Sequence, residues 1–105
     1  MSLYRSYIII MFELRFEWDP GKASSNDEKH GVTFEEAASC FVDERARIIP
    51  DPDHSHAEAR YVLLGKSWSL RILVVCHCHH RGSDVIRIIS ARRAARPERE
   101  QYRAR

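Results

Sequence analysis

The chain has 105 residues, which suits one domain with a modest core. Hydrophobic residues make up 44% and charged residues 30%, a balance typical of globular proteins and unlike disordered chains. No apolar run approaches the roughly 20 residues of a membrane helix, and LYRSYIIIMF at the start lacks a signal-peptide cleavage site. We expect a single cytoplasmic domain over residues 1–105, with residues 1–11 a possible N-terminal extension if Met11 is the natural start.

Charge is distributed unevenly along the chain. The net charge is +2, but from Arg81 onward there are eight arginines against three acidic residues, which is +5, so residues 1–80 carry −3. A basic C-terminal quarter suggests an anionic partner, and solubility alone is the alternative explanation. Three cysteines are an odd number for a disulfide framework in a chain without a secretory signal.

The first predicted elements are a strand and a polar helix. Apolar and polar residues alternate in FELRFEW, residues 12–18, as expected for a half-buried strand. Asp19 is a helix N-cap residue, and the proline after it suits a first helical turn. The predicted helix over residues 20–30 is almost entirely polar, and Gly31 ends it.

A second helix is predicted immediately afterwards. Thr33 and Glu36 have the spacing of a capping box, and Val32 can pack against Ala37 as a hydrophobic staple. Apolar residues then recur at helical spacing as far as Phe41.

The rest of the chain predicts four strands and a last helix. The strands are RARIIP, RYVLLGKS, WSLRILVVCHC and DVIRIIS, and Pro97 permits a helix from Arg96 to Arg103. Polar residues in 51–58 and in HHRGSD read as a loop and a turn. The order predicts an α+β domain with a single antiparallel sheet meander, two N-terminal helices and a C-terminal helix, the helices lying on one face.

One face of the polar helix is unusual for a surface helix. Lys22, Asn26, Lys29 and His30 fall at helical spacing and share this face. The face is either a short solvated surface held by its caps or a basic, hydrogen-bonding surface turned toward phosphate.

Arginines also occur inside apolar strands. Arg71 lies in LRILVV and Arg87 in IRII, and Arg92 and Arg93 follow at the end of the last strand. A guanidinium stays charged, so each must pair with an acid or reach solvent or a cleft. They are either paired structural residues or a cluster in one cleft that binds an anionic group such as phosphate.

The segment VVCHCHHRG invites a metal interpretation. It has neither a CxxC nor an HExxH spacing, although His54 and His56 could in principle complete a site. We expect no metal and no cofactor, with the cysteines as small buried hydrophobes and the histidines at a hairpin end.

Two motifs resemble a known family. FEWDPGKASSNDEKHGVTFEEA matches W-D-x-x-K-x-x-x-N-x-x-K-H-G-V-x-F-x-x-A, and VIRIISARRA followed by ERxxY matches the closing motif of the BrnT toxins, also called DUF497. The resemblance covers roughly residues 16–102. It implies a RelE-like fold, ribonuclease activity in a type II toxin–antitoxin system, and a BrnA-like ribbon-helix-helix antitoxin that binds operator DNA.

The resemblance and the charge pattern together nominate site residues. The expected catalytic residues are Lys29, His30, Arg71, Arg87, Arg92 and Tyr102, and the expected RNA-binding residues are Lys22, Asn26, Arg93 and Arg99. We expect a metal-independent endoribonuclease toxin that inhibits translation and forms a 2:2 complex with its antitoxin. The alternative is a non-catalytic module whose basic sheet surface binds nucleic acid or protein.

Overall fold

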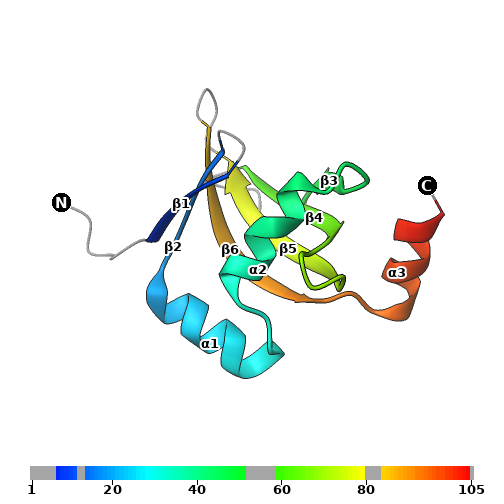
Figure 1. The fold of residues 1–105 in the computed structure, drawn as a ribbon, viewed down its shortest axis with the longest axis horizontal. Coiled ribbons are helices and arrows are strands. Elements are labelled where there is room, and N and C mark those ends of the chain that lie inside the picture. The colour runs from blue at the N-terminus through cyan, green and yellow to red at the C-terminus, as the bar shows by residue number, and fades with distance from the viewer. Residues whose placement is uncertain (1–6, 12–13, 52–58, 80–83, 105) are drawn as a thin grey trace.

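The computed structural model describes residues 7–11, 14–51, 59–79 and 84–104 (Figure 1). The elements in chain order are β1 Tyr7–Met11, β2 Leu14–Trp18, α1 Pro20–His30, α2 Phe34–Ser39, the 3₁₀ helix η1 Cys40–Val42, β3 Arg47–Pro50, β4 Arg60–Lys66, β5 Ile72–His79, β6 Val85–Arg93 and α3 Arg96–Arg103. In the described part of the chain, no helix is long and apolar enough to cross a membrane.

The strands form one sheet in the order β1-β2-β6-β5-β4-β3. Neighbouring strands are antiparallel except β2 and β6, which pair in parallel over Arg15–Glu17 and Val85–Arg87. The α+β class is confirmed, but the sheet is mixed rather than purely antiparallel. β6 pairs with β2 on one side and with β5 on the other. The strand that carries IRIISARR therefore lies in the middle of the sheet.

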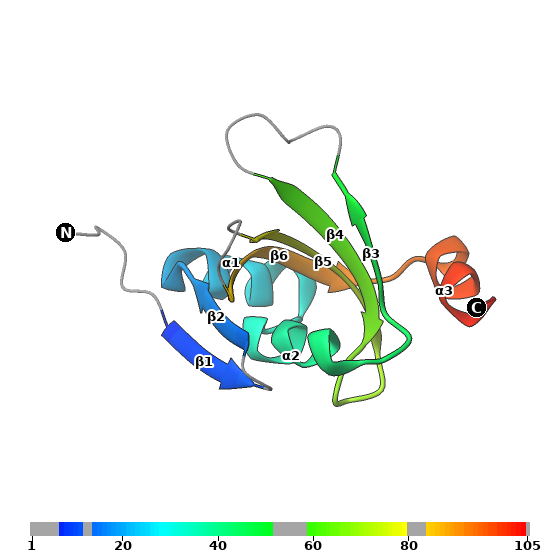
Figure 2. The same cartoon turned by 90° about the horizontal axis from the view of Figure 1, so that it is seen from above.

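Each face of the sheet packs against different helices (Figures 1 and 2). On one face, α1 and α2 cover a core with these buried residues: Phe16, Trp18, Val32, Phe34, Ala37, Ala38, Cys40, Leu63, Leu73, Val75, Ile86, Ile88 and Ala91. Alternate residues of β4 and β5 point to the other face, where Leu64, Ile72 and Val74 pack with Tyr102 of α3. The expectation that all helices share one face is therefore wrong, because α3 packs on the opposite side.

Most predicted elements are confirmed, and three differ. β5 begins at Ile72 instead of Trp68, because residues 68–70 form the turn between β4 and β5. The helices begin and end close to the expected residues, with α1 capped by Asp19 and ended by Gly31 at φ 68°. β6 continues three residues beyond the predicted strand, through Arg93, because those residues still pair with β5. β1 was not predicted, and it adds a strand beside β2 within the segment interpreted as a possible extension.

Candidate active site

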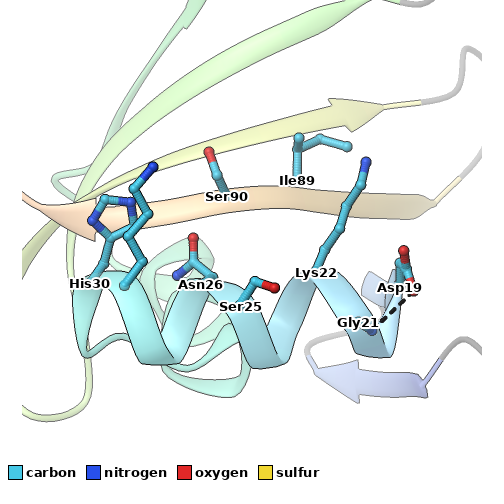
Figure 3. A pocket seen from close by; sticks show the side chains of 9 residues that line it. Asp19, Gly21, Lys22, Ser25, Asn26, His30, Ile89 and Ser90 are labelled. Atoms are coloured by element: carbon cyan, nitrogen blue, oxygen red, sulfur yellow. Dashed lines mark hydrogen bonds between the residues drawn. The ribbon is translucent and has the colours of Figure 1, made fainter.

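A hollow of about 490 Å³ lies where α1 runs beside β6 (Figure 3). We call it the α1–β6 hollow; its lining residues are Asp19, Gly21, Lys22, Ser25, Asn26, Lys29, His30, Ile89 and Ser90. Figure 3 shows Lys22 near the start of the helix and His30 at its end, with Ser90 of the strand between them. The predicted polar face of α1 therefore faces a hollow instead of a packed core.

Local backbone geometry fixes both ends of this helix. Asp19 has extended backbone and accepts a hydrogen bond from the Gly21 N–H at 3.0 Å. Gly31 adopts the left-handed conformation, and its N–H donates to the Asp27 carbonyl at 2.7 Å. His30 is thus the last helical residue, and the chain turns away directly after it.

Asn26 holds α1 against the edge of β6. Its side chain donates to the Ala91 carbonyl at 2.8 Å and accepts from the Ala91 N–H at 3.0 Å, the paired bonds that a neighbouring strand would supply. It also donates to the Val32 carbonyl at 3.0 Å, and the residue is only 7% exposed. Asn26 therefore has a structural role, since its amide is already hydrogen-bonded within the protein, and the predicted RNA-binding role stays a prediction.

A second hollow, of about 310 Å³, adjoins the first and shares His30 and Ser90 with it. We call it the His30–Arg92 hollow; its lining residues are His30, Val62, Val74, Cys76, Ser90, Ala91, Arg92 and Glu98. The pairing of β5 with β6 shifts register between Cys76 and His77, which leaves Ile89 as an extra residue on β6. Such a bulge redirects side chains, and in Figure 3 Ile89 and Ser90 leave the strand on the same side.

Arg92 is held by a carboxylate of α3. Its two terminal nitrogens donate to the two carboxylate oxygens of Glu98, each at 2.8 Å. These bonds raise the pKa of the Arg92 guanidinium and lower the pKa of Glu98. The hollow therefore combines an imidazole from α1 with a guanidinium–carboxylate pair from β6 and α3.

Arg71 lies outside this hollow, on the opposite face of the sheet from Arg92. Its guanidinium binds both carboxylate oxygens of the buried Glu36 and donates to the Gly31 carbonyl at 3.0 Å. Ser67 and Ser69 also donate to Glu36, and the hydrogen bond from Arg71 is the main reason that the pKa of Glu36 falls to about 2. The structure therefore shows Arg71 paired with an acid, and its expected catalytic role stays a prediction.

Arg87 lies on the same face as Arg92 but nearer the start of β6. It forms an ion pair with Glu17 at 3.2 Å, across the parallel pairing of β2 and β6. Arg87 pairs with Cys78 and Arg92 with Val74, positions that lie about 13 Å apart along β5. The prediction that Arg71, Arg87 and Arg92 share one cleft is wrong, because the sheet separates the first from the others and strand length separates the remaining two.

The predicted residues of the C-terminal segment have different positions. Tyr102 is 4% exposed, and its hydroxyl donates to Asp43 at 2.6 Å; burial, helped by this bond, raises the pKa of Tyr102 to about 12. Arg99 donates to the Ala94 carbonyl at 2.8 Å. Arg93 is exposed, but it pairs with Leu73 and so faces away from the hollow. Tyr102 and Arg99 therefore hold α3 in place, and the catalytic and RNA-binding roles expected for them stay predictions.

The histidine and cysteine segment is mainly structural where the structure describes it. His77 is buried between the rings of Phe41 and Tyr61, and burial lowers its pKa to about 4. The expectation that it decorates a hairpin end is therefore wrong. Cys78 is buried as expected. Among the described residues no cluster of His, Cys, Asp or Glu could hold a metal ion; His54 and His56 lie outside them.

The two hollows are lined by groups of the kinds that phosphodiester-binding and phosphodiester-cleaving proteins use. Ammonium and guanidinium groups suit phosphate oxygens, and an imidazole beside a carboxylate suits acid–base chemistry. The comparisons with known proteins give the family. Its profile, described as "Ribonuclease toxin, BrnT, of type II toxin-antitoxin system", matches residues 18–98, so the chain belongs to the BrnT toxin family.

A solved structure supports the assignment. The chain is similar to the 1.1 Å crystal structure of the Brucella abortus ribonuclease toxin BrnT, with a TM-score of 0.58 and 27% sequence identity. The match covers 75% of this chain and 94% of the other. No curated protein matched the sequence. Membership of this family identifies the chain as an endoribonuclease of a toxin–antitoxin system, which has RNA as its target and an antitoxin as its partner.

Sequence reasoning missed Glu98 and Ser90 as lining residues of the hollow. Both fall in the closing motif, which was the available signal. The residue types alone did not single them out. A glutamate among several arginines, for example, is usually part of a surface ion pair. The structure adds their position, since both line the same hollow as Arg92 and His30.

Proposed function

We propose that this toxin cleaves RNA without a metal ion, with the scissile phosphate in the His30–Arg92 hollow and the flanking backbone along the α1–β6 hollow. One observation carries the proposal: His30, at the end of α1, and Arg92, near the end of β6, line the same hollow. They are far apart in the sequence and belong to different family motifs.

The cationic groups along the two hollows suit an RNA backbone. Lys22, Lys29 and His30 line the α1–β6 hollow, and Arg92 lies directly beyond them. A guanidinium binds two phosphate oxygens at once and stabilises the charge that develops in the transition state. Lys22 and Lys29 then hold neighbouring phosphates, which makes their contribution dependent on salt.

The chemistry proposed is attack of a ribose 2′-oxygen on its own phosphate. The bond from phosphorus to the 5′-oxygen breaks, which leaves a 2′,3′-cyclic phosphate and a 5′-hydroxyl. One group must accept the 2′ proton and another must protonate the leaving oxygen. His30 handles one of these protons, because imidazole is the side chain most often used as a general acid or base and His30 lines the hollow.

The partner we propose is a BrnA-like ribbon-helix-helix antitoxin in a 2:2 complex that binds operator DNA through the antitoxin. The excess of arginine after residue 80 favours an acidic or amphipathic antitoxin segment as the cover for the basic surface. Released toxin would then inhibit translation in the cytoplasm by cutting RNA.

Cleavage of a labelled RNA by the purified chain in EDTA tests the catalytic proposal. Arg92→Gln should lower kcat/KM by roughly 100-fold or more, because it removes a charge that stabilises the transition state. Arg96→Gln is the matched control: it removes an arginine of the same segment, from an exposed pair with Glu100, and should change little. Loss of wild-type activity in EDTA, restored by a divalent ion, would contradict the metal-free mechanism.

Co-expression with the neighbouring small gene product tests the partner proposal. Light scattering of the purified complex should give a mass for two copies of each chain. Arg92→Gln should slow association most strongly at low salt. Separate elution of the two proteins at moderate salt would contradict the proposed pairing.

A further inference from the structure

We propose that Glu98 is the general base of the RNA cleavage reaction and that His30 is the general acid. The inference rests on the proposed function, because it assigns the second proton-transfer group that the reaction requires. Glu98 was expected only as part of a sequence motif, whereas the structure places its carboxylate in the same hollow as His30 and Arg92.

Few side chains in this hollow can accept a proton. Its titratable lining residues are His30, Cys76, Arg92 and Glu98. A guanidinium is permanently protonated, and a cysteine thiol ordinarily holds its proton at neutral pH. The carboxylate of Glu98 is kept ionised by Arg92, which lowers its pKa. Glu98 therefore enters the reaction as an acceptor and leaves the imidazole of His30 for the donor's role.

The hydrogen bonds of Glu98 leave one of its oxygens suited to a ribose hydroxyl. Oε1 accepts from Arg92 at 2.8 Å and from the Ala95 N–H at 2.7 Å. Oε2 accepts from Arg92 at 2.8 Å, its one recorded bond among the described residues. Since a carboxylate oxygen can accept two hydrogen bonds, Oε2 can take the proton of a 2′-hydroxyl while Arg92 remains attached.

His30 and Glu98 belong to different helices. His30 ends α1, which runs alongside β6, whereas Glu98 lies in the first turn of α3, which follows the end of β6 (Figures 1 and 2). In-line displacement needs the base and the acid on opposite sides of phosphorus. The bonds from Tyr102 to Asp43 and from Arg99 to Ala94 fix α3, so the carboxylate is held in position.

The proton balance of the step is complete without a further reactant. Oε2 of Glu98 takes the 2′-hydroxyl proton as the 2′-oxygen bonds to phosphorus. The bond to the 5′-oxygen breaks, and protonated His30 gives its proton to that oxygen. Arg92, which lines the same hollow and is hydrogen-bonded to Glu98, binds the non-bridging oxygens as charge accumulates on them.

A substrate with sulfur in place of the leaving 5′-oxygen separates the two roles, because a thiolate leaves without needing a proton. On ordinary RNA, Glu98→Gln and His30→Ala should each lower kcat/KM by roughly 100-fold or more. On the sulfur substrate, His30→Ala should recover to within about tenfold of wild type, whereas Glu98→Gln should remain defective. A His30 substitution that merely disturbs the fold would affect both substrates alike. Glu98→Gln is expected to be defective on both, so its urea unfolding is measured beside wild type: stability close to wild type assigns the loss to the missing base, and a large loss of stability assigns it to the bonds with Arg92 and Ala95.

Two further variants complete the experiment. Glu98→Asp keeps a carboxylate and should retain more activity than Glu98→Gln on both substrates. Glu100→Gln removes another carboxylate of the same helix, paired on the surface with Arg96, and should match wild type. Recovery of Glu98→Gln on the sulfur substrate, or full activity on ordinary RNA, would overturn the assignment. Increased activity would instead identify Glu98 as a group that blocks the phosphate site. If wild type cleaves neither substrate, the proposed function itself fails.

Discussion

Replacing Glu36 with glutamine should strongly destabilise the fold, because Glu36 is the centre of a buried polar network. Its carboxylate accepts hydrogen bonds from Arg71, Ser67 and Ser69, and the residue is 6% exposed. The network joins α2 to the turn between β4 and β5. Glutamine keeps the shape and one acceptor oxygen but leaves the Arg71 guanidinium without a charged partner.

The pKa of Glu36 sets the expected magnitude. It lies at about 2 instead of 4.5, mainly because of the Arg71 hydrogen bond. At about 1.4 kcal/mol per pH unit, this difference corresponds to about 3 kcal/mol of stability. Because the folded-state pKa is the lower one, the stabilisation is complete above about pH 4.5 and is lost as the pH falls toward 2. Arg71 is partly exposed, so water will offset some of the loss in the variant.

Urea unfolding at neutral pH and near pH 3 measures both effects. Glu36→Gln should lower the free energy of unfolding by roughly 2–4 kcal/mol at pH 7. Its stability should also fall less than that of wild type between pH 7 and pH 3, because the titrating group is gone. Glu35→Gln, at the exposed neighbouring position of α2, is the control and should stay within about 0.5 kcal/mol of wild type. An unchanged pH dependence in Glu36→Gln would refute the reasoning.

Three further substitutions test the structural roles assigned above. Asn26→Ala should cost about 2–4 kcal/mol in urea unfolding, since it leaves the Ala91 and Val32 groups unpaired, whereas Ser24→Ala on the exposed side of α1 should be nearly neutral. Gly31→Ala should cost about 1 kcal/mol through backbone strain at φ 68°, since no other atom obstructs the added methyl group; no loss would contradict this assignment. Tyr102→Phe should cost about 1–2 kcal/mol and leave RNA cleavage within about twofold of wild type; a large loss of cleavage with normal stability would restore a catalytic role.

Local signals in the sequence predicted the local structure well. Asp19 and Gly31 mark the ends of α1 because capping depends on residues adjacent to the helix. The Thr33 hydroxyl accepts from the Glu36 N–H as the capping-box pattern predicts. In a capping box the Glu36 carboxylate would also accept a hydrogen bond from the backbone N–H of Thr33. Here the carboxylate binds Arg71 instead. A distant guanidinium is a stronger partner for a buried carboxylate than a backbone N–H, and sequence spacing contains no information about it.

Long-range features were harder to predict for a related reason. A parallel pairing such as that of β2 with β6 joins segments about 70 residues apart, and no turn motif announces it. The choice between paired and clustered arginines also depended on tertiary structure. Arg71, Arg87 and Arg92 each have an acidic partner, but only Arg92 and its partner Glu98 line the hollow with His30.

The opening family motif combines residues that build the hollow with residues that we propose act in it. β2 pairs with β6 only as far as Arg87, so the later part of β6 has an edge that another strand would normally cover. Asn26 covers it by exchanging two hydrogen bonds with Ala91, the residue directly before Arg92. This contact fixes α1 in register with β6 and therefore fixes His30, one helical turn later, relative to Arg92. The polar composition of α1 is consistent with this arrangement. One side of the helix hydrogen-bonds to the edge of β6 and lines the hollow, so little of its surface is buried against apolar residues.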